Sequence, residues 1–215
     1  MKKIISIILS AIGLLAAQMA QAQGTVFVSN LGATPVGSAA IGSDSWVAQQ
    51  FITGTNSGGY VLNSVQLLMN TASGNPGGFS VSIYSFAVNA PASNLGSLTG
   101  LDPSAGGIFT YTASGLTLSP NLAYFVVLTS TTTMAQGGYV WSAATGVANP
   151  GIDRWLIFGQ YYNSADGLSW QGFRNKVFQL ALFATPVPEP ATYALAGLGL
   201  AISSFLRRRP GKSFF

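Results

Sequence analysis

The sequence predicts an all-β protein, an antiparallel β-sandwich of jelly-roll-like type, lying between two apolar end segments. From about residue 25 to residue 185, short β-branched and aromatic runs alternate with clusters of Gly, Asn, Ser and Pro. Within runs such as 65–69 and 79–83, apolar residues take every second position, which is typical of strands with one buried face. No helical period of useful length interrupts this pattern.

The first 22 residues have the pattern of a secretory signal peptide. Lys2 and Lys3 precede an apolar stretch, and Ala20-Gln21-Ala22 forms a small-x-small cleavage site. An uncleaved anchor is the alternative, but the stretch is short for a membrane span and the cleavage site follows it directly. We therefore expect export through the Sec translocon and a mature chain that begins near Gln23.

The segment 23–186 is predicted to form the β-sandwich domain. Turn-forming clusters at residues 55–59, 73–78 and 163–167 separate several of its strands. The Ser/Gly-rich stretch 87–106 is predicted to be a mobile loop. The strands are expected near residues 25–29, 46–53, 61–69, 79–86, 108–113, 123–130, 139–142, 155–161 and 177–184.

The last segment, 187–215, has three parts in a fixed order. The triplet Pro188-Glu189-Pro190 comes first, then an uncharged apolar stretch at 191–206, then Arg207, Arg208 and Arg209. The apolar stretch predicts a short transmembrane helix, because snorkelling arginines can cover its deficit in length. Positive flanks stay cytoplasmic, so the domain is expected outside the inner membrane. An ordinary core helix is the alternative, and it fits three consecutive arginines less well.

This arrangement resembles the PEP-CTERM sorting signal, which Gram-negative bacteria process with a membrane enzyme called exosortase. The two prolines keep the backbone extended and out of helix or sheet, which suits a segment that an enzyme must grip. The resemblance implies a precursor held only transiently in the inner membrane, then cut by exosortase and delivered to the cell surface or the extracellular matrix.

The domain itself resembles the choice-of-anchor R domains, which precede varied surface-anchoring signals. The similar features are Asn30-Leu31-Gly32, the run WVAQQF at 46–51, the run LTLSPNLAY at 116–124, and SADG at 164–167 ahead of Trp170. The family carries no established activity, so the resemblance implies no catalytic residues.

Composition excludes several classes of function. The chain has no cysteine and no histidine, which removes disulfides, thiolate chemistry and the commonest general base and metal ligand. The net charge of +4 comes from the end segments. Between residues 23 and 187 the acidic side chains are Asp44, Asp102, Asp153 and Asp166, and the basic ones are Arg154, Arg174 and Lys176. The domain is therefore nearly neutral and lacks the basic face that nucleic acid requires. We expect no enzyme, no cofactor, no metal and no nucleic-acid partner.

The aromatic region 155–170 is the one candidate for ligand binding inside the domain. Exposed aromatic rings stack on sugar rings, so Trp155, Tyr161, Tyr162 and Trp170 could form a glycan-binding face. The alternative, which we favour, is that these residues are core, as we also expect for Trp46 and Trp141. The function expected from the whole sequence is a structural component of exopolysaccharide, biofilm or envelope, with a glycan-binding module as the alternative.

Overall fold

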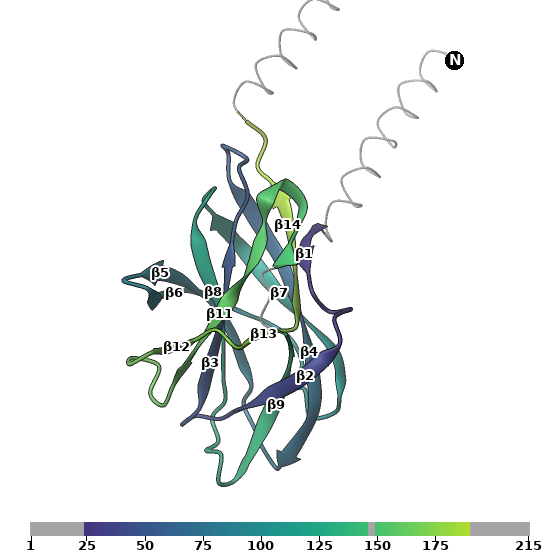
Figure 1. Cartoon of the computed structure of the whole chain (residues 1–215), viewed down its shortest axis with the longest axis vertical. Helices are drawn as coiled ribbons and strands as arrows, with labels where there is room; N and C mark the ends of the chain where they lie inside the picture. The colour runs from purple at the N-terminus through teal and green to yellow at the C-terminus, as the bar shows by residue number, and fades with distance from the viewer. Residues whose placement is uncertain (1–23, 146–148, 190–215) are drawn as a thin grey trace, which may run out of the picture.

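The computed structural model describes residues 24–145 and 149–189 (Figure 1). The predicted signal peptide at 1–22, the apolar stretch at 191–206 and the three arginines lie outside these ranges. Within them, no helix is long and apolar enough to cross a membrane.

Two antiparallel sheets of seven strands each pack face to face, which confirms the predicted β-sandwich. The chain changes sheet repeatedly, for example from β2 to β3 and back to β4. The first sheet contains β1 (Thr25–Ser29), β14 (Leu180–Pro186), β4 (Tyr60–Gly74), β9 (Gly137–Thr145) and β13 (Lys176–Phe178), with β2 (Pro35–Ile41) on β9 and β7 (Gly107–Leu118) on β4. The second contains β10 (Asn149–Pro150), β11 (Leu156–Ser164), β3 (Trp46–Ile52), β8 (Ala123–Thr129), β5 (Ser80–Ala87) and β6 (Ala90–Leu98), with β12 (Gln171–Phe173) on β11.

The core between the sheets is rich in aromatic side chains. Trp141 is fully buried, as predicted, and its ring stacks on Phe178 at a centroid distance of 4.7 Å. Trp46 differs from the prediction, because it is only partly buried and packs on the outer face of the second sheet. The reason is strand alternation: Val47 and Phe51 of β3 point into the core, which turns Trp46 outward.

Three buried amide side chains join the sheets and the N-terminal segment. The Gln179 side chain accepts from Ser142 Oγ at 2.7 Å and donates to the Ala33 carbonyl at 2.7 Å. The Asn30 Oδ1 atom accepts from Leu180 N at 2.7 Å. From the second sheet, Gln49 Oε1 accepts from Phe178 N at 2.8 Å. Because buried polar groups need partners, these three amides fix where the sheets meet.

The predicted loop at 87–106 is wrong over residues 90–98, because these form strand β6. This strand pairs with β5 through the two-residue turn Val88-Asn89, and Ala87 lies opposite Ala90. Both turn residues have left-handed φ angles, 49° and 63°, as a type I′ hairpin turn requires. Val88-Asn89 lacks the Asn-Gly signature of that turn, so the sequence did not predict the hairpin.

Four further differences concern short strands. The sequence does not predict β2, β10 or β12, and the segment predicted as one strand at 177–184 is split into β13 and β14. The split lies at Gln179, whose backbone N–H donates to Ser142 O at 2.9 Å while its carbonyl accepts from Leu68 N at 3.1 Å. The hydrogen-bonding partner of the chain therefore changes from β9 to β4 at Gln179.

Candidate functional site

The sorting segment leaves the domain as the direct continuation of a core strand. Pro186, the last residue of β14, lies opposite Tyr60 at the start of β4. The next residue, Val187, still makes two hydrogen bonds: its N–H donates to Gly59 O at 3.0 Å, and its carbonyl accepts from Asn56 Nδ2 at 3.0 Å. Beyond it, Pro188 and Glu189 are exposed. The folded domain therefore holds the chain up to the residue before the Pro-Glu-Pro triplet.

The turn that holds Val187 has room for glycine only. The turn is closed by Gly59 N donating to Asn56 O at 2.9 Å, and the Asn56 side chain also donates to Gly59 O at 2.6 Å. A Cβ atom at Gly58 would lie 2.5 Å from the Val187 carbonyl oxygen, closer than real Cβ contacts allow. Gly59 has a φ of +77°, which side chains rarely adopt. We call residues 54–59 together with Val187 the exit clamp.

Asp153 supports the exit clamp from the neighbouring connection. Its Oδ1 atom accepts from Thr55 Oγ1 at 2.6 Å, and its Oδ2 atom accepts from the Tyr60 hydroxyl. The hydrogen bonds from Thr55 and then Tyr60 lower the pKa of the Asp153 carboxyl. Asp153 and Arg154, in the 3₁₀ turn η2 (Ile152–Arg154), both have left-handed φ angles, 50° and 62°. Two successive non-glycine residues in this region cost free energy, so the contacts of Asp153 maintain a strained turn.

The four predicted glycan contacts do not share one surface. Trp155 is fully buried in the core between Phe27 and Phe51, at centroid distances of 5.1 and 5.9 Å. Tyr161 is also core, whereas Tyr162 faces the outer side of the second sheet and is buried there. The three cannot form an exposed platform, which corrects the glycan interpretation of these residues and agrees with the core interpretation that we favoured.

Trp170, the fourth, lies on the outer face of the second sheet with Trp46. The two rings meet edge to face at 6.5 Å, and both are partly exposed. Beneath them a second apolar cluster is buried, made of Ala48, Phe125, Val127 and Tyr162. Sequence reasoning missed this cluster, because β3 and β8 are apolar on both faces and periodicity does not separate the two sides.

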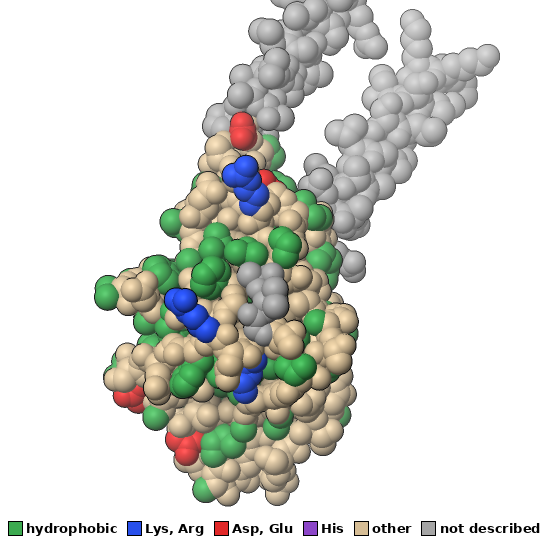
Figure 2. Space-filling model, viewed as in Figure 1, with side chains coloured by type: hydrophobic (Ala, Val, Ile, Leu, Met, Phe, Trp, Pro, Cys, Tyr) green, Lys and Arg blue, Asp and Glu red, His purple; other side chains and the backbone are tan. Residues whose placement is uncertain are grey.

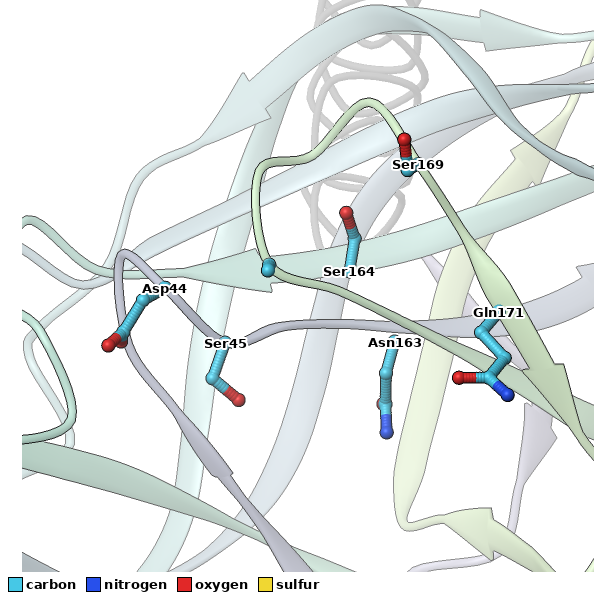
Figure 3. A pocket seen from close by; sticks show the side chains of 7 residues that line it. Asp44, Ser45, Asn163, Ser164, Ser169 and Gln171 are labelled. Atoms are coloured by element: carbon cyan, nitrogen blue, oxygen red, sulfur yellow. The ribbon is translucent and has the colours of Figure 1, made fainter.

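A polar cleft of about 310 Å³ lies between the turn before β3, the end of β11 and the start of β12 (Figure 3). In Figure 3, Ser164 and Ser169 point to one side of the strands, and Asn163 and Gln171 point to the other. The Asp44 carboxylate accepts from Met134 N at 2.8 Å. The Ser45 hydroxyl donates to Ala40 O at 2.9 Å. The lining residues are Asp44, Ser45, Asn163, Ser164, Ala165, Ser169 and Gln171. This set can hydrogen-bond a neutral polar molecule, but it contains no general base beside a nucleophile.

Asp166, in the connection between β11 and β12, organises a turn. Its Oδ1 atom accepts from Leu168 N at 2.8 Å, from Ser169 N at 2.9 Å and from Ser164 Oγ at 2.9 Å. The Ser169 and Leu168 N–H groups lower the pKa of this carboxyl, because they stabilise its ionised form. In the described parts of the chain, no group of three His, Cys, Asp or Glu side chains could hold a metal ion.

Comparison with known families identifies the segment that follows the exit clamp. The PEP-CTERM protein-sorting motif matches residues 186–209, starting at the last residue of β14. The protein carries a PEP-CTERM sorting signal. A comparison with curated proteins finds no match to the chain. As a PEP-CTERM protein it is an exosortase target, exported as a precursor that is held transiently in the membrane and destined for the cell surface. Pro188 and Glu189 lie inside the matched range, as predicted; Pro190, Arg207, Arg208 and Arg209 lie inside it too, but outside the described residues.

Proposed function

We propose that this PEP-CTERM protein is a non-enzymatic structural component of the exopolysaccharide, biofilm or envelope outside the cell. The observation that carries the proposal is the continuity between the core strand β14 and the sorting motif, which begins at Pro186. A chain built this way is delivered as a folded sandwich. We further propose that signal peptidase cuts after residue 22 and that exosortase removes the arginines, because both end segments have the pattern of processing signals.

The absence of a catalytic constellation in the described residues supports a structural role. The Ser45 hydroxyl donates to a backbone carbonyl. The Ser164 hydroxyl donates to Asp166 Oδ1 at 2.9 Å, but the Ser169 and Leu168 N–H groups lower the pKa of this carboxyl, which makes it a weak base. The chain has no histidine to supply a stronger base. The buried tyrosines do not fill this gap, since burial raises the pKa of Tyr161 and Tyr162 and keeps both hydroxyls protonated.

Intact-mass analysis of the envelope and medium fractions tests the processing. In cells with active exosortase, we expect a mature species that begins near Gln23 and lacks Arg207 to Arg209. Pro188→Ala should leave the precursor unprocessed, whereas Pro35→Ala, at an exposed proline at the start of β2, should be processed normally. A full-length envelope species that keeps the arginines in such cells would contradict the proposal.

The role in the matrix needs a separate measurement. In a strain unable to make exopolysaccharide, the mature protein should move from the cell-associated fraction to the medium, because its partner is gone. The same distribution in both strains would argue against a matrix role and leave the processing untouched.

Glycan binding remains a second candidate, now at the cleft. Trp46 directly follows Ser45, and Trp170 lies between Ser169 and Gln171, so the two partly exposed rings are sequence neighbours of the polar lining. Aromatic rings and hydrogen-bonding groups are what sugar binding requires. Trp170→Ala should abolish retention on the strain's own exopolysaccharide without unfolding the protein. Unchanged retention in this variant would exclude the cleft as the binding site.

A further inference from the structure

The distance between the folded domain and the sorting segment is set by very few residues. Val187 is fixed by Gly59 and Asn56, and the predicted apolar helix begins at residue 191. Residues 188–190 span at most about 10 Å when fully extended. Any enzyme that takes this triplet into its active site must therefore come within about 10 Å of the domain surface.

The surface around the exit clamp carries exposed apolar side chains. Leu122 is 50% exposed and Ile152 is 57% exposed. Both adjoin the clamp through their neighbours in the chain: Asn121 N donates to Gly54 O at 2.8 Å, and a Cβ atom at Gly54 would clash with Asp153 O. Arg154 and Glu189 add one charge of each sign, and Figure 2 shows blue and red side chains at this end of the molecule. We call Leu122, Ile152 and Arg154 the exit surface.

The turn that carries Ile152 and Arg154 is held in an unfavourable conformation. Asp153 and Arg154 take left-handed φ angles, and the side-chain contacts of Asp153 with Thr55 and Tyr60 keep them there. The residues of η2 are not themselves buried, although the next residue, Trp155, is fully buried in the core. Such strain persists where a surface is shaped for a purpose.

We propose that the exit surface docks on the sorting enzyme during processing, so that the folded domain is part of what the enzyme recognises. The proposal rests on the proposed processing by exosortase. The occupant is the enzyme itself, because an enzyme that binds residues 188–190 must come within about 10 Å of this surface each time it processes the chain. The clamp contributes to recognition by fixing Val187, the residue directly before the triplet, which lowers the entropic cost of ordering the chain on the enzyme.

The test follows the conversion of precursor to mature protein in cells, after a pulse of labelling of the full chain. Leu122→Glu and Ile152→Glu, each alone, should slow conversion about fivefold or more, the effect of losing an anchor in a protein interface. The control is Leu168→Glu, a leucine that is 84% exposed near the polar cleft, at the other end of the sandwich. Melting curves of the purified variants should match the wild type, since all three positions are on the surface.

An insertion variant separates tether length from the surface itself. Ten Gly/Ser residues inserted after Val187 free the triplet from the clamp, so conversion should become insensitive to Ile152→Glu. Normal conversion of both glutamate variants without the insertion would overturn the docking proposal, while Pro188→Ala still blocks processing. If Pro188→Ala is also converted, the proposed processing itself fails.

Binding to lipid is the competing outcome. The mature protein should not sediment with vesicles of phosphatidylethanolamine and phosphatidylglycerol. Sedimentation that Ile152→Glu abolishes would assign the surface to the membrane and overturn its assignment to the enzyme.

Discussion

At the scale of single residues, Asp153 shows how one carboxylate organises the exit clamp. Its hydrogen bonds lower its pKa, so the folded state favours the ionised form. The resulting stabilisation is complete above the ordinary carboxyl pKa of about 4 and is lost as the pH falls through the lowered folded value. We therefore expect the melting temperature to fall below about pH 4 more steeply in the wild type than in Asp153→Asn. Parallel curves for the two proteins would show that this carboxylate contributes nothing.

For Trp155, the core interpretation and the glycan-contact interpretation predict opposite effects of substitution on stability. It is fully buried, with its ring 5.0 Å from Tyr60 and edge to face with it. Trp155→Ala should therefore cost about 3–5 kcal/mol in the free energy of unfolding, and Trp155→Phe clearly less. Denaturant titration followed by circular dichroism measures both. An unchanged stability in Trp155→Ala would revive the glycan interpretation of this residue.

At the scale of elements, the β5–β6 hairpin carries a correctable strain. Val88 is β-branched, 95% exposed and left-handed at a φ of 49°. Val88→Asn should stabilise the protein by about 0.5–1 kcal/mol, because Asn tolerates this conformation. Val36→Asn is the control, since Val36 is 57% exposed in strand β2 with ordinary backbone angles, and it should give no gain. Thermal melts compare the two, and equal effects would contradict the turn assignment.

The elements also show what periodicity can predict. Strand β1 was predicted at its observed bounds, and β3 and β8 differ by one residue each, because their buried faces are marked by large apolar side chains. Strand β2 escaped because PVGSAAI is built of small residues. Strand β6 escaped because it is mostly exposed and follows an unusual turn. The split at Gln179 depends on a buried amide whose partners come from elsewhere in the chain, which local sequence does not report.

At the scale of the whole molecule, one part of the candidate site could be predicted from the sequence and another could not. The sorting motif could be predicted because its three parts are contiguous in the sequence. The exit clamp could not, since Asn56 reaches Val187 across 131 positions and Tyr60 reaches Asp153 across 93. The second apolar cluster and the cleft likewise depend on the pairing of β3, β8 and β11, which alternation alone does not give.

The sandwich should fold without help from metal or redox chemistry. The chain has no cysteine, and its described residues offer no cluster of three metal ligands. We expect the fragment 23–186 to give a β-rich spectrum and a melting temperature that EDTA and reductant leave unchanged. A collapse of stability on adding EDTA would contradict this and direct attention to Asp153 and Asp166.

The sandwich has two different ends. Thr25 at the start of β1 lies opposite Ala184 in β14, so the first and last strands have their free termini at one end (Figure 1). The turn after β8, which includes the exposed residue Ala135, lies at the other end. Exposed turns of this kind accept inserted domains. A passenger protein spliced in at Ala135 would therefore lie at the end of the sandwich opposite β1's first residue and β14's last, clear of the sorting motif, which makes the fold a suitable carrier for display.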